Sequence, residues 1–197
     1  MKREIWKEVM DADWGLYEYL HDEINRYYGT LGIRLRQVEM QSSEFFAGNL
    51  QGTGHAERVM ILGTLIAALA PMDDKYMPWV IDACAWHDIM RRGNGTDVQH
   101  GEQAADIVER YTVARGDDLR IVQAAIAAHS RGDRKMRGMM DRYGVQDRIG
   151  CELVACVLKD ADALDRVRSG DLNEKYLRLE PSKSLIGFAQ WLYGEWR

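Results

Sequence analysis

Apolar residues recur at intervals of three and four along most of the chain, the period of helices that bury one face. Over residues 2–28 this pattern predicts one or two amphipathic helices, which end near Gly29 and Gly32. A short strand is the alternative at residues 32–38. The stretch 41–54 is rich in serine, glycine and asparagine, and predicts a loop of the kind that can close over a site.

The remaining patterns also predict helices. A strongly apolar helix covers residues 54–70 and stops before Pro71. The next begins near Pro78 and runs through residue 88, and the glycines at 93–95 break it. The polar stretch 130–142 is expected to separate two helical regions. Further helices are expected over residues 98–115, 117–129, 146–168 and 184–196.

Length and composition favour one all-α domain. The chain has 197 residues, of which 46% are apolar, and this is enough for one sizeable core without demanding two. We expect residues 1–53 to form a helical segment and a loop that pack on a core of residues 54–180. Residues 181–197 should add a last helix to the same domain.

The net charge and the cysteines indicate which partners and which cellular compartment to expect. The formal net charge of -5 gives no electrostatic reason to expect duplex nucleic acid as a partner. The three cysteines lack the spacing of a zinc knuckle and suit a reducing compartment. The first residues lack a secretory signal, and the longest apolar run, 59–72, is too short to span a bilayer. The sequence therefore predicts a cytoplasmic protein without membrane partners, and it leaves a homo-oligomer open.

Two His-Asp dipeptides occur, and their surroundings differ. His21 and Asp22 lie in a charged helix without ligand-rich neighbours, which indicates a solvated face. His87 and Asp88 end an apolar helix, where an ionisable pair needs a partner to offset its desolvation. The second dipeptide is the candidate for chemistry.

The other histidines fall at comparable places, since His55 and His100 begin predicted helices and His129 ends one, while Asp162 lies within a further helix. Antiparallel helices can present ligands near their ends at one end of a bundle. Imidazole and carboxylate donors suit manganese, iron, nickel, cobalt or zinc without distinguishing them, and a carboxylate can bridge two ions. The candidate ligands are His55, His87, Asp88, His100, His129 and Asp162.

The order of these residues and their local context resemble the HD-domain superfamily of metal-dependent phosphohydrolases. Gly54-His55-Ala56-Glu57-Arg58-Val59 resembles its first helix, and Trp86-His87-Asp88-Ile89 its signature pair. The segments that begin at His100 and end at His129 resemble the extra histidine motifs of members with two metals. Residues 159–165 resemble the closing aspartate motif, in which Asp162 is the ligand by comparison. The resemblance covers about residues 54–180.

The resemblance implies an HD-type helical bundle with a metal centre at the helix ends. One ion would be held by His55, His87, Asp88 and Asp162, and a second by His100, His129 and Asp88. It further implies hydrolysis of phosphate monoesters or diesters, with nucleotide-type substrates, by a metal-activated water.

Phosphate binding also needs cations, and arginine offers bidentate geometry. Arg91 and Arg92 are the first candidates because they follow the His-Asp pair directly, and with Asp88 and Lys159 they form the expected catalytic group. Glu57 fits better as an acid in the first helical turn. Asp160 and Asp165 fit groups that orient ligands. The expected substrate-binding residues are Arg58, Arg131, Arg166 and Arg168.

Some branches of the superfamily fit poorly. The sequence Ile89-Met90-Arg91-Arg92 stands where stringent-response hydrolases carry an acidic pair, and the Gly-Tyr-Pro motif of the cyclic-dinucleotide branch is not matched. Three alternatives to the hydrolase remain open. They are a diiron oxygenase of the same fold, a nuclease for single strands and a nucleotide sensor without turnover.

Overall fold

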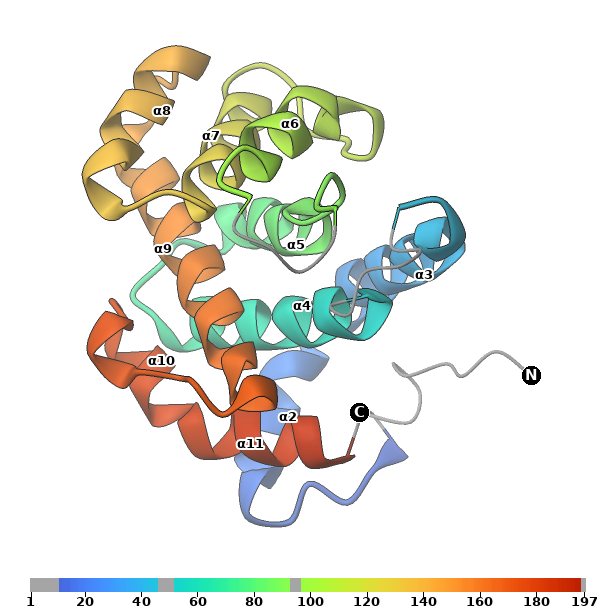
Figure 1. The fold of residues 1–197 in the computed structure, drawn as a ribbon. Coiled ribbons are helices and arrows are strands. Elements are labelled where there is room, and N and C mark those ends of the chain that lie inside the picture. Colours follow the sequence, from blue (N-terminus) through green and yellow to red (C-terminus); the bar gives the residue numbers. More distant parts are fainter. Residues whose placement is uncertain (1–10, 46–51, 93–96, 196–197) are drawn as a thin grey trace.

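The computed structural model describes residues 11–45, 52–92 and 97–195, and omits the side chains of residues 42–45. Within these ranges the chain forms helices joined by short turns and loops, without a strand, which confirms the all-α class (Figure 1). No helix there is both long and apolar enough to cross a bilayer. The expectations for residues 2–10, 46–51 and 93–95 fall outside the described residues.

Four helices form the centre of the molecule: α4 (Gly52–Leu69), α5 (Met77–Trp86), α7 (Asp117–His129) and α9 (Arg148–Leu164). Every residue of α4 from His55 to Ala67 is buried, which explains why apolar residues lie on all sides of this helix after Arg58. Helices α4 and α5 approach closely at Gly63, where an added Cβ would lie 2.5 Å from the Cys84 sulfur. The packing of this pair therefore depends on a residue without a side chain.

Further helices cover the centre on two sides (Figure 1). Helices α6 (His100–Ile107) and α8 (Met136–Tyr143) pack on α7, while α2 (Glu18–Asn25) and α3 (Tyr28–Phe45) pack on α4. Helices α10 (Glu180–Ser184) and α11 (Ile186–Glu195) follow α9, and the ring of Phe188 on α11 lies 5.4 Å from that of Tyr17, just before α2. There the ring of Trp14 is 5.3 Å from that of Phe188 and 5.6 Å from that of Trp191. The two ends of the described chain thus share one aromatic cluster.

The prediction between residues 29 and 54 is wrong in two respects. Gly29 and Gly32 lie inside α3 rather than ending a helix, and residues 32–38 are helical rather than extended. The helix forms because Leu31, Leu35 and Val38, spaced by four and three, bury one face completely or nearly so. Residues 41–45 and 52–54, expected in a loop, also belong to helices.

Several helix boundaries also differ from the expectation. The polar stretch 130–142 contains most of α8, whose buried Met136 and Met140 are one turn apart. The helix expected over 98–115 ends at Ile107 and continues as a 3-10 turn to residue 110. The last helical region starts at residue 180 and is divided in two. Helix α5 ends at Trp86, so the His-Asp pair lies in the turn that follows it.

Candidate metal centre

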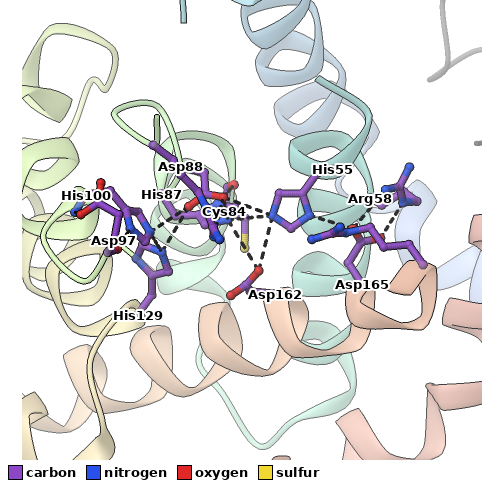
Figure 2. Close-up of polar contacts among 12 residues, drawn as sticks. His55, Arg58, Cys84, His87, Asp88, Asp97, His100, His129, Asp162 and Asp165 are labelled. Carbon is purple, nitrogen blue, oxygen red and sulfur yellow. Dashed lines mark hydrogen bonds and ion pairs between the residues drawn. The ribbon is translucent and has the colours of Figure 1, made fainter. Parts of the chain in front are cut away.

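The six predicted ligands come together from five elements of the fold (Figure 2). Histidines occupy the first turn of α4, the first position of α6 and the last position of α7, and one His-Asp pair follows α5. The aspartate near the end of α9 completes the group. The members are His55, His87, Asp88, His100, His129 and Asp162.

One set of donor atoms surrounds the imidazole of His55. Its Nε2 lies 3.2 Å from Nε2 of His87, 3.6 Å from Oδ2 of Asp88 and 3.4 Å from Oδ1 of Asp162. Nε2 of His87 is 3.8 Å and 4.0 Å from the same two carboxylate oxygens. Four side chains therefore direct one donor atom each toward a common point.

A second set of donor atoms lies on the other side of Asp88. Nε2 of His100 and Nε2 of His129 are 2.9 Å apart, and they lie 3.0 Å and 3.5 Å from Oδ1 of Asp88. The two oxygens of this carboxylate thus face different histidine pairs. Asp88 is therefore common to two groups of side chains that could hold a metal ion.

Hydrogen bonds of the other ring nitrogen fix the tautomer of each histidine. Nδ1 of His55 lies 2.7 Å from Oδ2 of Asp165, which can only accept when ionised. In the other three rings Nδ1 donates to the carbonyl three residues earlier, namely Cys84 for His87, Asp97 for His100 and Ile126 for His129. A proton on Nδ1 leaves the lone pair on Nε2 when the ring is neutral.

These contacts test whether a metal fits. Two Nε2 lone pairs about 3 Å apart repel each other unless a proton or a metal cation lies between them, and nitrogens bound to one zinc at about 2.1 Å are roughly 3.0–3.4 Å apart. Oδ1 of Asp88 is buried and has no properly oriented hydrogen bond among the described residues, although His100 is near. The donor set and its geometry fit divalent ions on both sides of Asp88.

Burial and charge set the protonation of the group without an ion. Burial lowers the pKa of His87 to about 4, so this ring is neutral at pH 7. Burial also opposes a charge on His55, but hydrogen bonds with Asp162 and Asp165 outweigh it and raise the pKa to about 9. For Asp88, burial favours the neutral form, yet His87 and the other histidines hold the pKa well below its usual value. A binding cation would therefore displace a proton from His55.

Comparison of the chain with family models, with curated proteins and with solved structures gave no match. The family resemblance therefore rests on the order and context of the ligand residues alone. The geometry of the donor atoms is an independent observation, because it does not depend on any relative.

Asp165 is the main support of His55. Its carboxylate is buried and also accepts hydrogen bonds from Nε and Nη2 of Arg58, at 2.5 Å and 3.0 Å, and from Nε of Arg168 at 3.1 Å. Figure 2 shows His55 between this ion pair and the donor cluster. The guanidinium groups of Arg58 and Arg168, expected at the substrate, are thus engaged in orienting a ligand. Asp160, the other flanking carboxylate, instead binds Arg178.

The remaining candidate cations differ in their distance from the centre. Arg131 pairs with Glu102, and the exposed Arg166 pairs with Asp171. Arg92 is exposed. Nη1 of Arg91 lies 3.5 Å from Oδ2 of Asp88, and its buried Nε has no acceptor in the described part of the chain. Arg91 is therefore the cation that lies against the donor cluster.

Lys159 lies behind the centre, at the end of α7. Its buried Nζ donates to the carbonyl of Ala128 at 3.1 Å and to that of Arg131 at 2.6 Å, and it pairs with Asp133 at 2.9 Å. Burial lowers the pKa of this lysine. These contacts hold the backbone on either side of His129. Among the described residues Lys159 makes no hydrogen bond or ion pair with the donor atoms, so nothing supports the catalytic role expected from the sequence.

We expect Lys159→Met to lower the free energy of unfolding by about 1–3 kcal/mol, because one buried and one partly buried carbonyl lose their donor. The same change should weaken binding at the histidine pair of α6 and α7. Urea unfolding and a zinc titration measure the two effects, with the exposed Lys183→Met as the control. Equal stability and zinc affinity in the two variants would contradict this role.

The sequence did not identify the three carbonyl acceptors, at residues 84, 97 and 126. Every residue has a carbonyl, so no residue type signals this function. A usable signal is position, because the last carbonyls of a helix lack partners within it. For His87 and His129, at the ends of α5 and α7, the carbonyl three residues earlier is such a group.

Proposed function

We propose that this protein is a metal-dependent hydrolase of phosphate esters with two divalent ions. The observation that carries the proposal is the position of Asp88, whose two oxygens face two separate pairs of imidazole nitrogens. Sites with two ions that share a carboxylate suit displacement at phosphorus. Nucleotide-type monoesters or diesters are the proposed substrates, as the family resemblance implies.

In this proposal His55, His87, Asp88 and Asp162 hold one ion, and His100, His129 and Asp88 hold the other. Bound ions would supply an activated water and neutralise charge on the phosphoryl oxygens. Asp165 keeps the proton of His55 on Nδ1, which leaves Nε2 for the metal. Asp88 stays ionised among the histidines.

Two partly exposed side chains beside the donor atoms support entry of a phosphate. The side chain of Asp162 is 33% exposed, whereas those of His87 and Asp88 are almost completely buried. The side chain of Arg91 is 20% exposed and lies beside Asp88. A substrate would approach past Asp162, and Arg91 would donate to a phosphoryl oxygen.

The proposed location is the cytoplasm, with a small phosphorylated molecule as the partner. The thiols of Cys84, Cys151 and Cys156 are free, and the first two are buried. Free thiols suit a reducing compartment, where they stay unpaired.

The direct test is hydrolysis of p-nitrophenyl phosphate, its bis ester and a set of nucleotides, with manganese, nickel, cobalt, zinc or iron added. We expect turnover that requires a metal and disappears on chelation, because the metal provides the nucleophile. Oxygen uptake by an iron-loaded sample without hydrolysis would replace the hydrolase by an oxygenase. The absence of both activities with every metal and substrate would contradict an enzymatic function of this class.

A further inference from the structure

A second candidate site lies in a groove between α3 and the segment that follows α6. Its volume is about 380 Å³, within the range of sites that bind small molecules. Helix α3 contributes Arg34, Gln37 and Met40, and the other side is formed by Trp86, Arg110 and Tyr111. None of the lining residues is among the candidate metal ligands, so the groove is a separate feature of the molecule.

The wall of this groove is held in place by a buried ion pair. Nη2 of Arg34 lies 2.5 Å from Oδ1 of Asp82, and the hydroxyl of Thr112 donates to the other oxygen of that carboxylate. Nη1 of Arg34 donates to the carbonyl of Tyr111 at 3.0 Å and to Gln37. The guanidinium is thus fixed, and its charge is balanced by Asp82.

Two buried donors at the groove have no acceptor among the described residues. They are Nε1 of Trp86, a residue that is 1% exposed, and Nε of Arg34, which is 7% exposed. A buried N–H without an acceptor destabilises the protein, so such groups are rare unless a ligand or water pairs with them. A ligand that supplies acceptor oxygens would satisfy both.

The charge and the apolar lining of the groove indicate which class of ligand it would bind. Arg110 is exposed at the groove, and no carboxylate lines it within the described residues. The charge of Arg34 is balanced by Asp82, so Arg110 is the arginine of the lining whose charge can attract a negative ligand. The ring of Tyr111 and the side chain of Met40 offer an apolar surface, and the buried ring of Trp86, with its centroid 5.0 Å from that of Tyr111, lies behind it. A flat apolar body with an anionic group matches these features.

We propose that this groove binds a small organic anion with a flat unsaturated ring. Its carboxylate or phosphate oxygens accept hydrogen bonds from Trp86 and Arg34 and pair with Arg110, while the ring packs against Met40 and Tyr111. This site is independent of the hydrolase proposal, since it uses none of the metal ligands.

The test follows the indole N–H signals in proton–nitrogen correlation spectra of the isotope-labelled protein. The chain has six tryptophans, and the signal that is missing in Trp86→Phe belongs to Trp86. Naphthoate and naphthylphosphonate are the probes, and their comparison separates a carboxylate from a phosphate ligand. Naphthalenemethanol is the uncharged reference. We expect one or both anions to shift the Trp86 signal saturably and the alcohol to leave it in place.

Two arginine variants complete the test. Arg110→Ala should weaken binding about tenfold, because a charge-assisted contact is lost. Arg36→Ala, an exposed change on α3 outside the lining of the groove, should leave the affinity unchanged. If Trp86→Phe does not fold, the Trp86 signal is assigned by backbone resonances of the unmodified protein. A Trp86 signal that stays fixed with both anions at about 10 mM, or the same affinity in Arg110→Ala as in the unmodified protein, would overturn the proposal.

Discussion

Replacement of Asp88 by alanine should lower hydrolysis by about a thousandfold or more and remove both ions. The reason is geometric, because one oxygen lies 3.6 Å from Nε2 of His55 and the other lies 3.0 Å from Nε2 of His100. Loss of this carboxylate removes a ligand that both sets share, and it leaves the pair of His100 and His129 without a carboxylate. The rate with p-nitrophenyl phosphate esters and the metal content per chain measure the effect.

The chain offers a matched control in its other His-Asp dipeptide. Asp22 is exposed on α2, and Asp22→Ala should keep the activity and metal content of the unmodified protein. Circular dichroism of both variants separates loss of the site from loss of the fold. If Asp88→Ala retained hydrolysis, or if Asp22→Ala lost it to the same degree, the assignment of the site would be wrong.

A methyl group at Gly101 should separate α6 from α7. A Cβ there would lie 2.7 Å from Oγ of Ser130, 2.8 Å from the carbonyl oxygen of Ile126 and 3.1 Å from a ring carbon of His129. The carbonyl belongs to the α7 backbone and cannot move alone. We expect Gly101→Ala to lower the free energy of unfolding by about 1–3 kcal/mol. It should also release the ion held by His100 and His129.

The ion at His55 and His87 should remain in Gly101→Ala, because those residues lie on other elements. Gly138→Ala on α8 is the control, since nothing lies within 4 Å of its added Cβ. That change should raise the stability by about 0.5–1 kcal/mol, because alanine favours a helix. Unchanged stability and full metal content in Gly101→Ala would contradict the close packing of α6 on α7.

The histidine ligands and Asp88 could be predicted from sequence because each lies near an end of a predicted helix, whereas Asp162 was assigned by the family resemblance. The helix pattern placed His55, His100 and His129 at helix termini, and the structure has them there. The error at α3 has a physical cause. Gly29 and Gly32 weaken a helix, but burial of Leu31, Leu35 and Val38 outweighs this local preference.

The roles of the arginine and lysine side chains were harder to predict, because a residue that is close to a ligand in sequence can bind a group that is far away in sequence. Arg58 follows His55 closely, yet its carboxylate partner Asp165 is 107 positions away. Lys159 binds backbone carbonyls, which carry no sequence signal. Only the folded chain distinguishes a cation that supports a ligand from one, such as Arg91, that lies against the donor cluster.

The most direct test of the central claim is the number of ions bound per chain, measured by elemental analysis after loading with zinc or manganese and removal of free metal. We predict two ions in the unmodified protein, one in His129→Ala and none in Asp88→Ala. These ion numbers follow from two sets of donor atoms that share the carboxylate of Asp88. An unmodified protein without bound metal, or a His129→Ala variant with the same content as the unmodified protein, would contradict the two-ion centre.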